Sequence, residues 1–347
     1  MTKDSKILQI EEISFKYTKN EPILDNFSID VNHGEFVTVL GDSGAGKTTL
    51  FRAINGLEKI SNGYIRVDGN LMSSSFYHVS PEKRPVGTIF QDYALFPHFN
   101  VEKNIYYGLD KKNYDKKFVD EIIELLRVEN FLKRYVDELS GGQRQRVSLA
   151  RALVRKPKIL LMDEPYSNLD KNLRQEIRRD LKKILSKIGS TVLLITHDSE
   201  EALSLSDKIG YLYQGKIIQF DTPYQIFHNP SHKIIAKSIS NSNILEGISD
   251  GGKIKTDLGE FVIEEKINSD RKVNINVRPS QLSLVSSEEE YEIVEEEFLE
   301  GNQLFLVKNI KTDQIINVSM SGANNFFLGQ KVGIQIINDY ANMTNIS

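Results

Sequence analysis

The sequence of 347 residues contains no cysteine. This absence excludes disulfide bonds, zinc knuckles and cysteine-ligated iron–sulfur clusters, so any metal must be held by oxygen or nitrogen atoms. The first residues, MTKDSKILQIEEI, lack the apolar core and cleavage site of a secretion signal, and no stretch approaches roughly 18 uninterrupted apolar residues. We therefore expect an intracellular chain that is not exported and does not span a bilayer by itself.

An excess of positive charge is also lacking. The chain has 44 Lys and Arg against 48 Asp and Glu, which gives a net charge of −4 and a pI near 6.0. This balance provides no general basic field for nucleic acid, so we expect no nucleic-acid partner. The length exceeds what one typical core holds, and a division into about two domains is expected.

The glycine-rich stretch GDSGAGKTT is the most informative part of the chain. It follows the apolar run Phe36–Leu40 and precedes a helical pattern, which is the setting that a phosphate-binding loop requires and that argues against a chance glycine-rich turn. Its glycines let backbone amides converge on an anion at the positive end of a helix. Lys47 is expected to reach the β- and γ-phosphates, and the Thr48 hydroxyl to ligate Mg²⁺. The predicted nucleotide-binding residues here are Gly41, Asp42, Ser43, Gly44, Ala45, Gly46, Lys47, Thr48 and Thr49.

Polar residues end three further apolar segments. VGTIFQDY breaks at Gln91, KILLMDEP ends in Asp163 and Glu164, and TVLLITHD reaches His197. Ligands of parallel sheets bind at the carboxyl ends of the strands, so these side chains are expected to face the phosphate site. Asp163 is a candidate to hold Mg²⁺, and Glu164 to orient the attacking water or accept its proton. Gln91 is a candidate to contact Mg²⁺ or the attacking water, and the alternative is an amide that only faces solvent. For His197 the alternative is a structural histidine.

LSGGQ, residues 139–143, opens a helical pattern that Pro157 stops. Ser140 stands at a cap position, and Gly141 and Gly142 allow close approach, so this is a second anion-binding device. The alternative is a capped helix start with no ligand. One small ATPase domain seldom needs two phosphate cradles unless the second serves a neighbouring molecule.

The remaining segments before residue 240 complete an alternating pattern. ILQIEEISFKY, ILDNFSIDV and GYIRVDGNLM indicate one antiparallel layer, in which Tyr17 either stacks on an adenine ring or is a half-buried strand residue. Apolar spacing between Tyr114 and Tyr135 predicts a helical insertion. An amphipathic helix over Asn172–Ile188 supplies the right-handed crossover between two parallel strands.

Together these stretches resemble the ATP-binding subunit of ATP-binding-cassette (ABC) transporters, over about residues 1–240. The resemblance implies an α/β P-loop NTPase fold with a parallel-sheet core, an antiparallel β subdomain and a helical subdomain, and a requirement for ATP and Mg²⁺. It implies these roles: Tyr17 stacks on adenine, Gly41 to Thr48 form the Walker A loop, Gln91 is the Q-loop glutamine, Ser140, Gly141, Gly142 and Gln143 belong to the signature, Asp163 and Glu164 end the Walker B strand, Asp170 closes the D-loop, and His197 is the switch histidine.

The resemblance also implies a head-to-tail homodimer, in which Ser140 and Gly142 of one subunit contact the γ-phosphate held by Lys47 of the other. ATP would close the dimer and hydrolysis would open it. The Gln91 loop would pass this motion to two membrane permease subunits. FQDYALFPHFNVEKNI looks like bacterial importers that use a solute-binding protein, which would be an indirect partner. The implied location is peripheral, on the cytoplasmic face of the bacterial inner membrane.

One short stretch of the sequence bears on the identity of the transported solute. DEPYSNLDKNLR, with Asn168, looks most like ferric-iron importers, with polyamine, sugar or sulfate as alternatives. A soluble ATPase of the same superfamily acting on DNA or ribosomes is a rival, but such proteins usually carry long coiled coils or two cassettes. A non-catalytic subunit is a second rival, which would be expected to lack Glu164 or His197.

A composition shift near Asn241–Asn243 marks a second domain, so we predict an ATP-binding domain at 1–240 and an accessory domain at 243–347. Short β-rich segments predict a small antiparallel barrel, and VRPSQLSLV resembles the OB/TOBE-like barrel of sugar, polyamine and iron importers. A regulatory barrel and one that only steadies the dimer both remain open. The acidic run Glu288–Glu297 has no metal-loop geometry and is expected to be a solvated surface.

Overall fold

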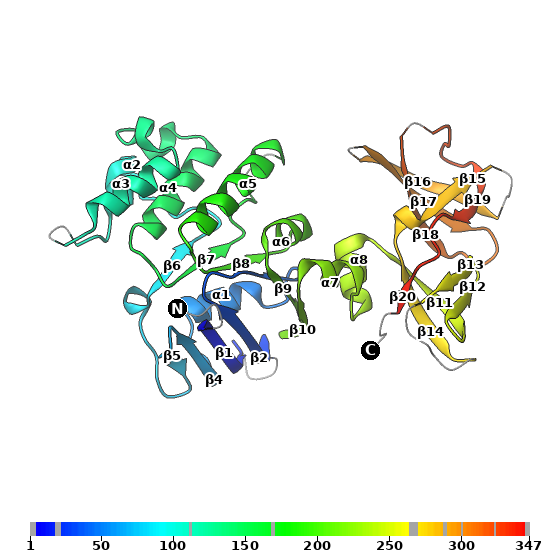
Figure 1. Cartoon of the computed structure of the whole chain (residues 1–347), viewed down its shortest axis with the longest axis horizontal. Coiled ribbons are helices and arrows are strands. Elements are labelled where there is room, and N and C mark those ends of the chain that lie inside the picture. Colours follow the sequence, from blue (N-terminus) through cyan, green and yellow to red (C-terminus); the bar gives the residue numbers. More distant parts are fainter. Residues whose placement is uncertain are drawn as a thin grey trace. The chain divides into compact units, whose positions relative to one another are not determined.

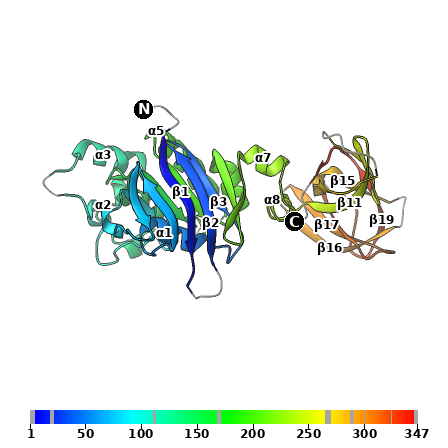
Figure 2. The same cartoon turned by 90° about the horizontal axis from the view of Figure 1, so that it is seen from below.

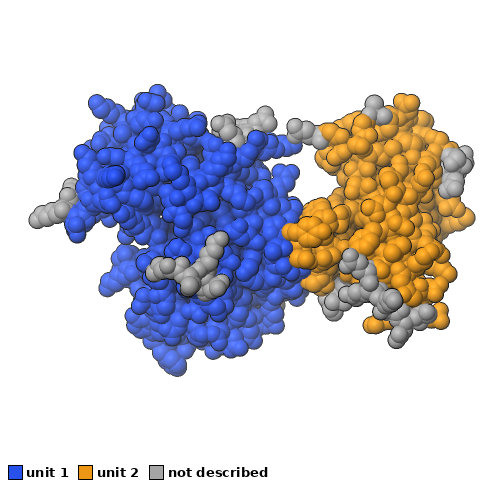
Figure 3. Space-filling model, in the orientation of Figure 1, with its two compact units in different colours: residues 1–223 blue, residues 224–347 orange. Residues whose placement is uncertain are grey.

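The computed structural model describes residues 5–17, 22–110, 113–167, 171–263, 270–286, 290–299, 301–322 and 324–343. The chain divides into two compact units, residues 1–223 and 224–347 (Figure 3). Within the described ranges, no helix combines the length and apolarity needed to cross a membrane.

A six-stranded sheet forms the centre of the first unit, with the order β10-β9-β3-β8-β7-β6. Its strands are β3 (Phe36–Leu40), β6 (Val86–Ile89), β7 (Ile159–Asp163), β8 (Val192–Thr196), β9 (Lys208–Tyr213) and β10 (Lys216–Asp221). All neighbours are parallel except β9 and β10. The parallel core that the sequence predicts is therefore confirmed.

A second sheet of the same unit is antiparallel and has the order β2-β1-β4-β5. Its strands are β1 (Lys6–Phe15), β2 (Leu24–Asn32), β4 (Asn62–Val67) and β5 (Asn70–Ser74). They are the strands predicted from the alternating patterns near the start of the chain and from GYIRVDGNLM. The antiparallel β subdomain is confirmed.

Side chains of the buried parallel strands alternate between two cores. In β7, Leu160 and Met162 belong to one core, whereas Ile159 and Leu161 belong to the other. Such alternation is the consequence of a two-residue repeat in strands that are covered on both faces. The first core also contains α2 (Val101–Tyr106), α3 (Lys116–Leu125), α4 (Gly141–Leu153) and α5 (Lys171–Lys187), and the second contains α1 (Lys47–Asn55) and the antiparallel sheet (Figures 1 and 2).

The insertion predicted between Tyr114 and Tyr135 is helical only in part. The helix α3 ends at Leu125, and Arg127 takes a left-handed conformation with φ 54°. A short 3₁₀ turn at Glu129–Phe131 follows. The apolar residues after α3 still enter the core, so tertiary packing continues the apolar pattern without one continuous helix. The remaining helices are α6 (Ser199–Leu205), α7 (Pro223–His228) and α8 (Lys233–Ser240).

The second unit contains two antiparallel five-stranded sheets around one core. The first sheet contains β11 (Asn243–Asp250), β12 (Lys253–Thr256), β13 (Gly259–Val262), β14 (Lys272–Val277) and β20 (Asn342–Met343), and the second contains β15 (Leu282–Val285), β16 (Tyr291–Leu299), β17 (Asn302–Asn309), β18 (Ile315–Ser321) and β19 (Lys331–Ile336). Phe261 and Ile275 of the first sheet share this core with Phe305 of the second. The small antiparallel barrel is confirmed.

The acidic run largely coincides with strand β16. Tyr291 and Ile293 are buried, and residues 295–297, all glutamates, are exposed. In the described part of the chain, no group of three or more His, Cys, Asp or Glu side chains is arranged to hold a metal. Glu288 and Glu289 lie outside the described residues.

The predicted boundary between the two domains lies next to a helix end. The helix α8 ends at Ser240, its C-cap residue Asn241 has φ 48°, and β11 begins at Asn243. The compact units divide earlier, between residues 223 and 224, so α8 is grouped with the barrel. The division into domains 1–240 and 243–347 stays a prediction about which segments fold independently.

A chain shortened after Asn241 is expected to bind ATP with an affinity close to that of the full chain. The physical reason is that the two cores of the first unit are built from residues between Ile7 and Leu212. Titration with a fluorescent ATP analogue measures this, with the full chain as control. Loss of nucleotide binding in a folded shortened chain would contradict the predicted domain division.

Candidate functional site

The predicted site residues follow strands whose ends are aligned. In the parallel sheet Leu40 pairs with Thr196, Asp163 with Ile195, and Ile89 with Met162. The residues that come next in the four strands therefore lie along one edge of the sheet. This register places Gly41, Glu164 and His197 directly after the carboxyl ends of neighbouring strands, and Gln91 two residues beyond the end of β6.

The amine of Lys47 points into the glycine-rich loop. Its Nζ donates hydrogen bonds to the carbonyl oxygens of Gly41 at 2.7 Å and Asp42 at 2.8 Å. Burial lowers the pKa of Lys47, while the negative charges of Glu164 and Asp163 oppose this effect. The Lys47 ammonium is thus partly desolvated and bonded to backbone carbonyls of the loop. The carboxylates of Asp163 and Glu164 act on it electrostatically.

Two glycines of the loop leave no room for a side chain. A Cβ atom at Gly41 would collide with the carbonyl oxygen of Leu212, and one at Gly46 would lie 2.8 Å from the carbonyl oxygen of Ile23. Gly46 also has φ 108° and caps α1 without a side-chain hydrogen bond. The unpaired amides of the first helical turn are therefore available to an anionic group. Thr48 is exposed beside them, and Thr49 is buried.

Glu164 and His197 form a direct pair. The Nδ1 atom of His197 lies 2.8 Å from Oε1 of Glu164. Because a carboxylate only accepts hydrogen bonds, Nδ1 carries the proton in this pair. Glu164 has φ 43°, and its amide donates to the carbonyl oxygen of Ile195 at 2.9 Å. Left-handed backbone at a non-glycine residue is strained, and it turns the carboxylate toward the end of β8.

Asp163 and Glu164 are both half-buried. Burial, with the adjacent charge of Glu164, raises the pKa of Asp163 to about 6, and Lys47 partly offsets this. A divalent cation would favour the ionised form. The Asp163 carboxylate and the exposed Thr48 hydroxyl are the oxygen donors that Mg²⁺ prefers, so the residues present fit that ion.

Gln91 is exposed, in a turn that follows β6. Two residues of this loop have left-handed backbone: Tyr93 with φ 63° and Ala94 with φ 44°. Helix α4 holds them, because Ser148 Oγ donates to the Tyr93 carbonyl at 3.2 Å and Arg151 donates to the carbonyls of Ala94 at 2.7 Å and Tyr93 at 3.0 Å. The sequence gives no sign of these contacts beyond the spacing of Ser148 and Arg151 on one helix face.

The start of α4 makes hydrogen bonds within its own first turn. Ser140 Oγ accepts from the Gln143 amide at 3.4 Å, and Gln143 Oε1 accepts from the Ser140 amide at 3.0 Å. This capping box is the structural role foreseen for Ser140. Gly142 is buried and Gly141 is half-buried. A contact of these residues with a neighbour's phosphate stays a prediction.

Tyr17 and Asp170 complete the predicted set. The Tyr17 side chain is 59% exposed and meets the Phe15 ring edge-on at a centroid distance of 4.7 Å. This side chain is more exposed than the structural alternative expects, and adenine stacking stays a prediction. Asp170 lies outside the described residues.

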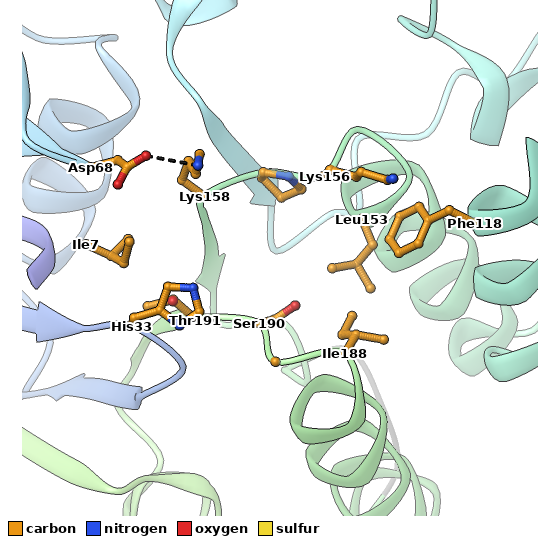
Figure 4. A pocket seen from close by; sticks show the side chains of 12 residues that line it. Ile7, His33, Asp68, Phe118, Leu153, Lys156, Lys158, Ile188, Ser190 and Thr191 are labelled. Atoms are coloured by element: carbon orange, nitrogen blue, oxygen red, sulfur yellow. Dashed lines mark ion pairs between the residues drawn. The ribbon is translucent and has the colours of Figure 1, made fainter. Parts of the chain in front are cut away.

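A separate hollow of about 310 Å³ lies at the opposite edge of the sheet. Lys158 and Thr191, which line it, directly precede β7 and β8. In Figure 4 the Lys158 ammonium is paired with Asp68, at 2.9 Å. None of the predicted site residues lines this hollow, so it is not the nucleotide site.

The sequence of this chain is similar to those of known ATP-binding proteins. Residues 24–167 match the ABC transporter family. The spermidine/putrescine import ATP-binding protein PotA of Clostridioides difficile (strain 630) is 37% identical over 330 residues, which cover 89% of this chain and 93% of that protein. PotA of Desulfitobacterium hafniense (strain Y51) is 39% identical over 298 residues, 82% of each chain.

Solved structures share the fold of the first unit. One is cbiO1 of Clostridium perfringens, part of the ABC transporter complex cbiONQ, with a TM-score of 0.58 and 28% identity over 64% of this chain and 91% of that one. Another is the ATP-binding cassette MJ0796 bound to ADP and phosphate as a dimer, with a TM-score of 0.53 and 27% identity over 62% and 98% of the two chains.

Proposed function

This chain belongs to the ABC transporter family of ATP-binding proteins, and from that premise we propose that it hydrolyses ATP to drive polyamine import through membrane permease subunits. ATP hydrolysis coupled to transport follows from family membership. The polyamine solute rests on relatives named spermidine/putrescine import proteins, one of which is similar over 89% of the chain.

The hydrogen bond between His197 and Glu164 carries the catalytic part of the proposal. Glu164 is placed to orient the attacking water and accept its proton, and His197 fixes the carboxylate at 2.8 Å. Lys47 and the amides at the start of α1 hold the phosphates. Tyr17 stacks on the adenine ring through its exposed face.

Mg²⁺ would be held by the Asp163 carboxylate and the Thr48 hydroxyl, with Gln91 nearby at the adjacent strand end. When bound, the ion neutralises phosphate charge and orients the leaving group. The role of the protein is to present ionised Asp163. Burial and the charge of Glu164 raise the pKa of Asp163 to about 6, which opposes ionisation, and a bound cation would favour the ionised carboxylate.

The partners of this function are a second copy of the chain, two permease subunits and, indirectly, a solute-binding protein. In the proposed homodimer Ser140 and Gly142 of one subunit complete the nucleotide site of the other. The chain would act on the cytoplasmic face of the bacterial inner membrane, as a peripheral subunit held there by the permeases.

A hollow of about 500 Å³ beside the Gln91 loop offers a place for the permease. Phe90, Ala94 and Phe96 of the loop form one wall, and Arg151 and Arg155 form another. Because Arg151 also holds the Gln91 loop, a permease segment seated here would sense the movement of that loop.

The expectation of ferric iron is not supported. The named relatives are spermidine/putrescine import proteins, so polyamine, the first alternative, replaces iron. Iron was expected from the sequence around Asn168, which lies outside the described residues. In an importer the solute passes through other subunits, so we expect this stretch to carry little information about what is transported.

Deletion of the gene tests the solute directly. We expect uptake of radiolabelled spermidine or putrescine to be lost in a strain with no other polyamine importer, and iron uptake to stay at the parental level. The parent gene should restore polyamine uptake, whereas the Glu164→Gln gene should not. Unchanged polyamine uptake in the deletion strain would refute the proposed solute.

Replacing Tyr17 with alanine is expected to weaken ATP binding by about 0.5 to 1.5 kcal/mol, the usual value of an aromatic stack. This corresponds to a dissociation constant raised about 2- to 12-fold. Hydrolysis at saturating ATP should change little, since Tyr17 does not contact the phosphates. Tyr17→Phe, which keeps the ring, is the matched control. An unchanged affinity in Tyr17→Ala would show that the residue only packs on Phe15.

A further inference from the structure

A buried charged network lies directly behind His197. Arg178 of α5 is 5% exposed, and Glu201 of α6 is 2% exposed. The Arg178 guanidinium donates to Glu201 Oε1 at 3.1 Å and to Asp198 Oδ2 at 2.8 Å. Arg174 donates to the same Asp198 oxygen at 3.1 Å. The exposed Glu200 carboxylate also lies 3.6 Å from Arg178, so two cations face three carboxylates, and Arg178 and Glu201 form the buried part of this network.

This network holds the backbone on both sides of His197. Thr196 Oγ1 donates to Glu201 Oε2 at 2.7 Å and accepts from the Asp198 amide at 3.0 Å. Asp198 Oδ1 accepts from the Glu201 amide at 3.0 Å. The His197 ring itself is exposed, so packing of the ring does not fix its direction. Its position is set by the residues before and after it.

Arg178 also lies against the segment that follows Glu164. Tyr166 is fully buried, two residues beyond Glu164, and the Arg178 guanidinium stands over its ring at 5.8 Å. The Tyr166 hydroxyl has no hydrogen-bond partner among the described residues. Shape and the cation over the ring therefore hold this tyrosine in place. One arginine therefore contacts the segments that follow both strands presenting the catalytic pair.

We propose that Arg178, paired with Glu201, is a positioning residue that holds His197 in hydrogen-bond contact with Glu164. This inference rests on the proposed function of that pair in hydrolysis. Among the contacts of the described residues, Arg178 reaches Asp198, Glu201 and the Tyr166 ring and none of the phosphate-binding loop, so it acts through those neighbours. Its loss leaves Asp198 and Glu201 as partly unpaired carboxylates, which repel each other and shift the backbone next to His197.

The kinetic test is a double-mutant cycle with His197. Arg178→Met keeps the length of the side chain and removes the charge. With His197 present, we expect kcat to fall about 10- to 100-fold, because small misplacements of catalytic groups cause losses of this size. The KM for ATP should be nearly unchanged. In the His197→Ala background the same substitution should change the single-turnover rate less than about two-fold, because the group it positions is absent.

Two variants keep the test valid if Arg178→Met folds poorly. Arg178→Met combined with Glu201→Gln removes both charges of the pair, so it leaves fewer unpaired carboxylates than Arg178→Met alone. The double variant should show the same loss of kcat. Arg179→Met removes an exposed cation from the next position of α5 and should hydrolyse ATP at the parental rate. Thermal unfolding confirms which variants are folded.

A second readout does not depend on hydrolysis. The chain has six histidines, and His197 can be assigned in ¹⁵N-histidine spectra by its loss in His197→Ala. In the parent we expect the Nδ1-protonated tautomer, because Nδ1 faces a carboxylate. In folded Arg178→Met we expect this tautomer to lose its dominance.

The outcomes separate the two proposals. A parental tautomer in folded Arg178→Met, or an equal loss of rate in the presence and absence of His197, overturns the positioning role. A changed tautomer together with an unchanged rate supports the positioning role and overturns the proposed function of the Glu164 and His197 pair. A changed tautomer with a rate loss that depends on His197 supports both.

Discussion

Hydrolysis of ATP is expected to fall about 10²- to 10⁴-fold when Glu164 is replaced by glutamine, the usual cost of losing a general base. The substitution keeps the size of the side chain and removes the proton acceptor. Asp163, Thr48 and Lys47 are unchanged, so ATP and Mg²⁺ should bind as in the parent. The Glu164 carbonyl and amide contacts are backbone interactions and survive.

Single-turnover hydrolysis with radiolabelled ATP measures this loss, and nucleotide titration measures the retained affinity. Glu121→Gln is a matched control, since it makes the same chemical change at an exposed position of α3. The control should hydrolyse at the parental rate. A Glu164→Gln protein with parental activity would show that the water is activated by another group.

Much of the site could be predicted from sequence because it is built from local patterns. An apolar strand followed by a polar residue is visible in one dimension, as in KILLMDEP before Glu164 and TVLLIT before His197. Parallel pairing then brings such strand ends to a common edge. The register, with Asp163 beside Ile195, supplies the proximity that local patterns alone do not give.

The buried charges could not be predicted in this way. Arg84, in the polar run PEKRP, reads as a surface residue, yet it is 4% exposed. It donates to the carbonyls of Ala53 and Ile54 at the end of α1, and to Ser73 Oγ of β5. Burial lowers the pKa of Arg84 to about 10. Its role depends on α1 and β5 meeting in space, which no local pattern encodes.

Arg178 and Glu201 were missed for a related reason. Both lie in charged helical stretches, and charged helix faces are usually solvated. Contact between α5 and α6 buries one position of each helix and pairs the two charges. A periodicity argument identifies the apolar face of each helix, but it does not show which polar position a neighbouring helix will cover.

An ATP-dependent dimer of Glu164→Gln is expected to disappear when Ser140→Arg is added. In the slowly hydrolysing protein the γ-phosphate stays intact, so two copies should run as a dimer with ATP and as a monomer with ADP in size-exclusion chromatography. The arginine is bulky and obstructs the nucleotide held by the partner subunit. Binding of ATP to Lys47 of its own subunit should persist, because Ser140 is bonded only within the first turn of α4 among the contacts described.

Ser140 also caps α4, so loss of the dimer could follow from a weakened helix instead of an obstructed site. Ser140→Ala in the same Glu164→Gln background separates these causes, since it removes the cap, at a cost of about 1 kcal/mol, without adding bulk or charge. The alanine variant should still form a dimer with ATP, with a lower affinity than Glu164→Gln alone. If alanine abolishes the dimer as completely as arginine, the cap explains the loss. If the arginine variant still forms the dimer, the start of α4 does not complete the neighbour's nucleotide site, and the proposed head-to-tail arrangement is wrong.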